Sequence, residues 1–272
     1  MAKKKKNLLS EKEYQRYIID YLVENNKYIE RTNADFDRLF AMDKEMLFKF
    51  LDATQPETMT ALRKVYKKET EETIVQVINN GCTSEKGSLI KVLKDGVDIG
   101  NGSYHLDLMF NKPATTFNKE LTKKYEQNIF SVAEEIWAND EERIDLVVFL
   151  NGLAIMSFEL KCNEAGQTYE DAITQYRTQR SPKSRLFLFK AGTLVNFAMD
   201  LNEVHMCTRL EKEKTYFLPL NMGNGEGVDA GKGNPLRTDD YPVCYMWKDV
   251  LTKDSVLELI KKFIFVEKKE KK

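Results

Sequence analysis

Apolar and polar residues along the chain follow patterns that predict mostly helices in the first third, strands in the middle and a helix near the end. Residues 10–25 open with a capping box, Ser10 and Glu13, ahead of an apolar stripe at helical spacing. The other helical patterns cover residues 43–50, 56–78, 167–179 and 250–266. The strand patterns cover residues 89–92, 104–110, 128–132, 143–150, 153–161, 186–189, 194–199 and 204–208.

The clearest unit of this pattern is a hairpin in the middle of the chain. Two apolar runs, 143–150 and 153–161, flank the dipeptide Asn151-Gly152. This dipeptide favours a two-residue turn, because both turn positions need a positive φ. Residues 81–87 and the Gly- and Asn-rich stretch 221–240 are expected to be loops. Helices followed by a strand–helix–strand centre predict an α/β fold, a mixed sheet flanked by helices.

The size and composition are those of an ordinary globular protein, with 272 residues, 42% hydrophobic and 31% charged. No apolar run is long enough to span a bilayer, and the first residues lack a secretory signal. We therefore expect a cytoplasmic protein with no membrane partner. The expected organisation is a basic tail (1–9), a domain (10–266) and a second basic tail (267–272). Within the domain we expect a helical part (about 10–80), a part with the sheet (about 85–210) and a final loop and helix (about 211–266).

Cysteine and histidine usage excludes several kinds of site. The four cysteines are scattered without a Cys-x-x-Cys pair, which indicates free thiols and no disulfide framework or zinc site. Only His105 and His205 are present, too few for a zinc hydrolase or for a nuclease built on a histidine cluster. Metal chemistry must then rest on carboxylates, which favours Mg²⁺. The net charge of −1 argues against tight DNA binding by this chain alone.

Three residues at the open end of the hairpin form a candidate catalytic group. Glu159 and Lys161 are two apart on one strand and so project together, and Asp145 lies near Glu159 across the antiparallel pair. Two carboxylates can hold Mg²⁺, with the backbone carbonyl of Leu160 as a third oxygen ligand. Lys161 would stabilise developing charge and orient the attacking water. This set predicts metal-assisted phosphodiester hydrolysis.

A structural interpretation of the same residues stays open at this point. An Asp and a Glu-x-Lys at strand ends also occur as solvated edges or salt bridges. Asp107 is a rival acid in the sequence, but no Glu-x-Lys follows it on an adjacent hairpin, so we treat it as structural.

The segments 143–152, 158–161 and 166–177 closely resemble the N-terminal nuclease domain of the restriction (motor) subunit of type I restriction–modification enzymes, which belongs to the PD-(D/E)xK superfamily. The resemblance extends over nearly the whole chain. It includes residues 31–38, 53–56, 209–210 and 217–219.

The resemblance implies a role for each residue of the candidate group. Asp145 and Glu159 would be metal ligands and Lys161 the catalytic lysine. Gln175 would correspond to the glutamine of the Gln-xxx-Tyr element, although position 179 is Gln and the nearest tyrosine is Tyr176.

Further residues are weaker candidates. Arg177 and Arg180, together with Tyr176, are candidates for contacts to DNA, and the two arginines fit equally well as solvated charges at a helix end. Many members of the superfamily also use a glutamate on an early helix, and here Glu11 or Glu13 could take that place.

The resemblance implies an endonuclease domain that cuts double-stranded DNA with Mg²⁺, inside a complex with methyltransferase and specificity subunits. ATP would act only in the full-length subunit, because the nearest match to a P-loop here, residues 227–233, has the wrong glycine spacing. We therefore expect this chain to be a fragment or an isolated domain. The alternatives are a non-catalytic docking module that keeps the nuclease fold and a stand-alone nuclease for damaged or branched DNA.

Overall fold

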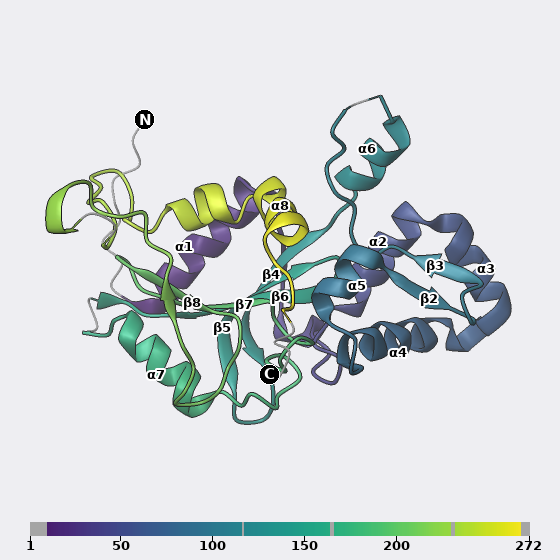
Figure 1. Ribbon diagram of the computed structural model, residues 1–272, viewed down its shortest axis with the longest axis horizontal. Coiled ribbons are helices and arrows are strands. Elements are labelled where there is room, and N and C mark those ends of the chain that lie inside the picture. The colour runs from purple at the N-terminus through teal and green to yellow at the C-terminus, as the bar shows by residue number, and fades with distance from the viewer. Residues whose placement is uncertain (1–9, 116, 164–165, 230–231, 268–272) are drawn as a thin grey trace.

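The computed structural model describes residues 10–115, 117–163, 166–229 and 232–267. A seven-stranded mixed sheet, in the order β1-β4-β5-β6-β7-β8-β9, runs through the molecule with helices on both faces (Figure 1). The predicted α/β fold is therefore confirmed. The basic tail expected at 1–9, residues 268–272 of the tail expected at 267–272, and residues 230–231 of the predicted loop lie outside the described residues.

The sheet is antiparallel except at two pairs, β1 with β4 and β6 with β7. Its central strands β5 and β6 are covered on both faces, which explains why their sequences are almost continuously apolar. The strands are β1 Ile29–Arg31, β4 Phe130–Trp137, β5 Arg143–Leu150, β6 Leu153–Leu160, β7 Val195–Met199, β8 Val204–Cys207 and β9 Leu218–Pro219.

Different helices cover the two faces of the sheet (Figure 1). Helices α1 (Glu11–Glu24) and α8 (Lys253–Lys262) pack with Leu146 and Val148 of β5 on one face. Helix α7 (Tyr169–Gln179) packs with Val147 and Phe149 on the other face. Helix α1 begins, and α7 ends, close to the strand ends that carry the candidate residues. Among the described residues, no helix is both long and apolar enough to cross a lipid bilayer.

A helical lobe extends from one side of the sheet, at the right of Figure 1, and α6 projects above this lobe in the same view. The lobe holds a separate two-stranded sheet, β2 paired with β3. Its elements are α2 Lys44–Thr54, α3 Pro56–Tyr66, α4 Thr70–Thr83, α5 Leu89–Asp95, β2 Val97–Ile99, β3 Tyr104–Leu106 and, projecting, α6 Lys119–Glu126. Short 3₁₀ turns occur at Asn33–Asp35, Lys67–Glu69 and Gly227–Asp229, and a π-helical turn at Met246–Val250.

Two predicted strands are wrong. Residues 89–92 belong to α5, because the Ser88 side chain caps the helix by accepting a hydrogen bond from the Lys91 N–H, and Gly96 ends it with a φ of 68°. Residues 186–189 form turns, because Gly192 donates back to the Leu188 carbonyl at 2.6 Å and closes a tight loop. A β-carbon at Gly192 would lie 2.1 Å from the Leu186 carbonyl oxygen, so only glycine permits this close approach.

Three other elements are shorter than predicted. The strand expected at 104–110 ends at Leu106, because the Asp107 N–H donates to the Gln55 side chain and no longer to a neighbouring strand. The helix expected at 56–78 breaks at Lys67, which adopts a φ of 51°. The C-terminal helix begins only at Lys253, after the π-helical turn.

The predicted hairpin turn is confirmed. Asn151 and Gly152 have φ values of 50° and 79°, and Leu150 pairs with Leu153 across the turn. The register then shifts between Val148 and Phe149, so that Ile155 of β6 is an extra residue, a β-bulge.

The bulge reverses the faces of β6 beyond it. Ala154 lies on the α7 face, and strict alternation would direct Met156 and Phe158 to that face as well. Instead Met156 and Phe158 lie in the core of the α1 face, while Ser157 and Glu159 turn toward α7 and bond to Tyr176 and Arg180. This single extra residue therefore decides which side chains of β6 reach the candidate site.

Candidate active site

The structure brings Asp145, Glu159 and Lys161 together where β5 begins and β6 ends. Oδ2 of Asp145 accepts a hydrogen bond of 2.7 Å from the Leu160 N–H. Nζ of Lys161 donates to the Leu160 carbonyl at 2.9 Å. The three side chains belong to residues that are only 5%, 0% and 6% exposed, respectively. They are therefore a buried charged cluster, and the solvated strand edge that the sequence left open is excluded.

Arg180 neutralises part of the negative charge of this cluster. Its Nε donates to Oε1 of Glu159 at 2.6 Å, and both residues are buried. The other oxygen of Glu159, Oε2, is buried and makes no hydrogen bond to any described residue. A buried carboxylate oxygen without a donor is costly unless something else binds it, so Oε2 is the atom open to a further ligand.

Helix α1 supplies two more residues to the site. Glu11 accepts from Nζ of Lys161 at 3.0 Å, so of the two early glutamates it is Glu11 that reaches the cluster. Glu13 stays at the helix start, where the Ser10 side chain caps its N–H. Gln15, which the sequence did not single out, donates to the Asp145 backbone carbonyl at 2.9 Å. Its position four residues after Glu11, on the same helix face, is the signal that could have found it.

Burial changes the acid–base behaviour of both carboxyl groups. Desolvation raises the pKa of Asp145 to about 6, although the Leu160 N–H and Lys161 oppose the shift. Desolvation and the neighbouring Asp145 raise the pKa of Glu159 to about 8, against the opposing effect of Arg180. The two groups interact and titrate as a pair. The cluster thus resists holding two negative charges unless a cation compensates them.

We expect Asp145→Asn to stabilise the metal-free chain at neutral pH. The pKa of Asp145 is about 6 in the folded state and near 4 in the unfolded state. The contribution of this carboxyl group to the free energy of unfolding is therefore complete below about pH 4, where the group is protonated in both states, and is lost as the pH rises through 6. This loss amounts to about 2–3 kcal/mol, and asparagine avoids it. Urea unfolding in EDTA at pH 4.5 and 7.5 measures the difference.

The matched control for that substitution is Asp140→Asn, at an exposed carboxylate outside the cluster. The gain in free energy of unfolding of Asp145→Asn over the parent chain is expected to be larger at pH 7.5 than at pH 4.5. The free energy of unfolding of Asp140→Asn is expected to stay within about 0.5 kcal/mol of the parent value at both pH values. An advantage of Asp145→Asn that is the same at both pH values would contradict the burial of an ionisable group at this position.

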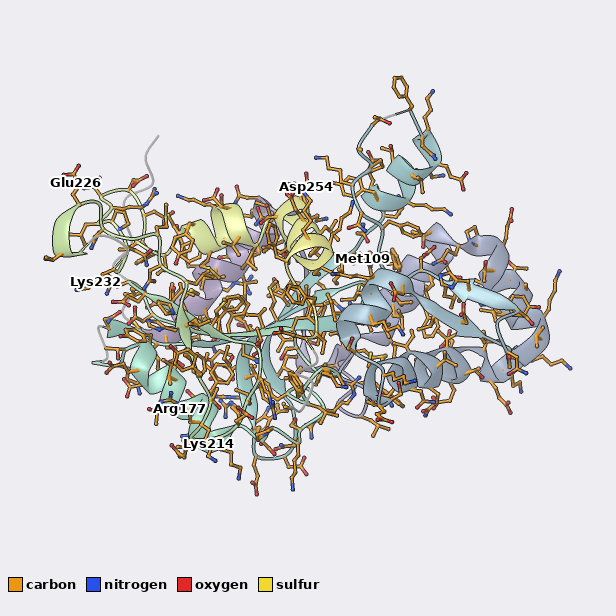
Figure 2. All side chains as sticks on the ribbon, viewed as in Figure 1. Met109, Arg177, Lys214, Glu226, Lys232 and Asp254 are labelled. Carbon is orange, nitrogen blue, oxygen red and sulfur yellow. The ribbon has the colours of Figure 1, made fainter. Side chains whose placement is uncertain are left out.

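The remaining predicted residues lie on or just past α7, at different depths. Gln175 is half-buried and makes no side-chain hydrogen bond to Asp145, Glu159 or Lys161 within the described part of the chain. Tyr176 is fully buried and its hydroxyl lies 2.8 Å from Oγ of Ser157, so it faces the sheet and not the surface. Arg177 donates to the Thr215 carbonyl, and Figure 2 shows it on α7 close to Lys214. Arg180 is 4% exposed and directed to Glu159.

Other acids, cysteines and histidines lie outside the cluster. Asp107 follows β3 in the helical lobe, where its carboxylate lies 3.6 Å from His105. His205 lies 3.2 Å from Glu203. The four cysteines are buried and form no disulfide. Among the residues that the structure describes, no three His, Cys, Asp or Glu side chains gather as a metal cluster.

The cluster nevertheless contains oxygen atoms of the type that a hard divalent cation binds. Oε2 of Glu159, the carboxylate of Asp145 and the Leu160 carbonyl are oxygen ligands, the type that Mg²⁺ prefers. Mg²⁺ is commonly held by one or two carboxylates and keeps several waters, so a third acidic side chain is not needed. The buried Oε2 without a donor is the observation that favours such an ion here.

A comparison with models of known protein families places the chain in one family. The sequence model of a family described as "Type I restriction enzyme R protein N terminus" matches residues 8–215 of the chain. This range includes α1, β5, β6 and α7, and with them every residue of the cluster. A search of curated proteins found no match.

Proposed function

Since the chain belongs to the family of type I restriction enzyme R protein N-termini, we propose that it is the DNA-cleaving endonuclease domain of such a protein. The proposed reaction is Mg²⁺-dependent hydrolysis of phosphodiester bonds in double-stranded DNA, at a site of the PD-(D/E)xK type. The observation that supports it best is the buried cluster of Asp145, Glu159 and Lys161 with one carboxylate oxygen left without a donor.

In this proposal Asp145, Oε2 of Glu159 and the Leu160 carbonyl hold the cation. When bound, Mg²⁺ supplies neutralisation of the scissile phosphate and a lowered pKa for a water molecule. The backbone N–H of Leu160 fixes the orientation of Asp145, because it occupies Oδ2. Gln15, on α1, donates to the backbone carbonyl of Asp145 and so fixes the start of β5 against α1.

Lys161 is the proposed catalytic lysine. Its ammonium group is oriented by Glu11 on one side and the Leu160 carbonyl on the other. From there it orients the attacking water and stabilises negative charge that develops on the phosphate. Glu11 is a positioning residue in this proposal, because it acts through Lys161.

The proposed contacts to DNA are fewer than those to the metal. Gln175 and Arg177 are the candidates on α7, since both are partly exposed. Tyr176 and Arg180 are buried and serve the interior of the site instead. The net charge of −1 fits a domain to which DNA is delivered by other parts of the enzyme.

The rest of the proposal concerns the larger assembly. Methyltransferase and specificity subunits would choose the DNA sequence, and ATP would be used elsewhere in the full-length R protein. Such an assembly would act in the cytoplasm. Residues 10–266 would form the endonuclease domain within it.

The test is restriction by a complex reconstituted with an R protein that carries Asp145→Ala. We expect DNA translocation and ATP hydrolysis to continue while double-strand cleavage is lost, because translocation does not use the metal site. Cleavage that survives the substitution would contradict the catalytic assignment and favour the non-catalytic docking module.

A further inference from the structure

Arg180 is a buried arginine fixed at several points. It follows the last residue of α7 directly, and it is 4% exposed. Its Nε donates to Oε1 of Glu159 at 2.6 Å, and its terminal nitrogen donates to the Arg143 carbonyl at 2.8 Å. One guanidinium group therefore bridges the first residue of β5 and the carboxylate near the end of β6.

The chain around Arg180 is fastened to the same strand. The N–H of Ser181, the next residue, donates to the Glu142 carboxylate at 2.8 Å. Two neighbouring residues past α7 thus bind two neighbouring residues at the start of β5, Glu142 and Arg143. These contacts fix the backbone from which the Arg180 side chain extends toward Glu159.

This arrangement makes the two oxygens of Glu159 unequal. Oε1 is held by Arg180, while Oε2 is buried and makes no hydrogen bond to any described residue. Rotation of the carboxylate would break the bond between Oε1 and the buried guanidinium of Arg180, and breaking a buried ion pair is unfavourable. Arg180 therefore fixes the plane of the Glu159 carboxylate and selects which oxygen remains open.

A lysine could not replace this contact. The planar guanidinium donates in two fixed directions at once, whereas an ammonium group is a compact charge on a flexible stem. Lysine would keep the charge near Glu159 and lose the simultaneous bond to the Arg143 carbonyl. Charge and geometry can therefore be separated by one substitution.

From these contacts, and resting on the proposed function, we propose that Arg180 is a positioning residue of the metal site, which holds Oε1 of Glu159 so that Oε2 alone is presented to the cation. Arg180 itself touches neither the cation nor the DNA. Its role is to fix a ligand before the cation arrives, as the outer partners of metal ligands do.

Binding of Mn²⁺ to the 272-residue chain, followed by isothermal titration calorimetry without DNA, tests this proposal. Arg180→Lys is expected to raise the dissociation constant about tenfold or more, the usual effect of losing an outer partner. Arg185→Lys is the matched control, because that arginine also donates to a backbone carbonyl, that of Ala191, but lies outside the site. It is expected to bind Mn²⁺ like the parent chain. Unchanged or tighter binding by Arg180→Lys would overturn the proposal, and tighter binding would identify Arg180 as a competitor of the cation.

Glu159→Gln separates this inference from the proposed function. If Glu159→Gln binds Mn²⁺ as tightly as the parent chain, Glu159 is not a ligand and the proposed metal site itself is wrong. If Glu159→Gln loses binding while Arg180→Lys keeps it, the metal site stands and only the role of Arg180 is wrong.

Chemical rescue distinguishes positioning from a general loss of structure. In Arg180→Ala, added methylguanidinium is expected to restore part of the Mn²⁺ affinity by occupying the vacated place, whereas ethylammonium at the same concentration is not. Equal effects of the two compounds would contradict a geometric role for the guanidinium. Thermal unfolding of each variant, recorded in the same buffers, shows that the folded chain is the species being titrated.

Discussion

Replacing Lys161 by alanine is expected to lower the rate of DNA cleavage by about 10²- to 10⁴-fold, the range found when a proton-transfer group or a charge-stabilising donor is removed. The side chain lies in the buried cluster, where its Nζ is 3.0 Å from Glu11 and 2.9 Å from the Leu160 carbonyl. Because Lys161 is buried, its ammonium group stabilises developing negative charge more strongly than an ammonium group in water would. Single-turnover cleavage by the reconstituted complex, with translocation followed in parallel, measures the effect.

The fold is expected to tolerate this substitution. Glu11, the partner that loses its cation, has a side chain 34% exposed, so water can solvate it. Lys44→Ala is the matched control, because Lys44 forms a 2.7 Å ion pair with Asp37 on the lobe side, away from the cluster. It is expected to leave cleavage unchanged. Equal cleavage by the Lys161 and Lys44 variants would contradict the proposed catalytic role of Lys161.

Gly152→Ala is expected to destabilise the chain by about 3–5 kcal/mol. Gly152 has a φ of 79°, which is unfavourable for alanine. A β-carbon there would also lie 2.3 Å from the Asp43 carbonyl oxygen and 2.6 Å from the Leu47 nitrogen, and both are backbone atoms that cannot easily move. The turn is tied to the same place by the Asp43 N–H, which donates to the Gly152 carbonyl at 2.7 Å. Equilibrium unfolding in urea measures the change.

Gly102→Ala provides the control for the backbone conformation alone. Its φ is 85°, close to that of Gly152, but a β-carbon there would meet nothing within 4 Å. We expect this variant to lose only about 1–2 kcal/mol, so that the difference between the two variants reports the close approach of the hairpin to α2. If both variants lose the same free energy of unfolding, the contact between the turn and α2 does not contribute.

Several features of the site followed from local sequence. The Asn-Gly turn and its apolar flanks predicted the β5–β6 hairpin, because the backbone conformation of that turn depends on two residues only. The Ser10 cap predicted the start of α1, and the helical pattern after residue 167 predicted α7. These features depend on interactions between residues that are close in sequence, and such interactions can be predicted from the amino-acid sequence alone.

Short apolar runs misled the prediction for a physical reason. Residues 89–92 are apolar apart from one lysine, and four residues are too few to separate a strand from a buried helix. The helix is selected by its ends, the cap at Ser88 and the glycine at 96. The pairing of Arg180 with Glu159 was likewise hidden, because the two residues are 21 positions apart and meet only when α7 packs on the sheet.

The sequence by itself determined the hairpin, the residue types of the candidate catalytic group and the family. Tertiary structure alone decided that Glu159 faces α7 and Arg180, through the bulge at Ile155. No local signal marks that bulge, because β6 is buried on both faces and its apolar residues do not reveal which side each one faces. The choice between Glu11 and Glu13 was also made by packing, since only Glu11 lies within reach of Lys161 when α1 covers the sheet.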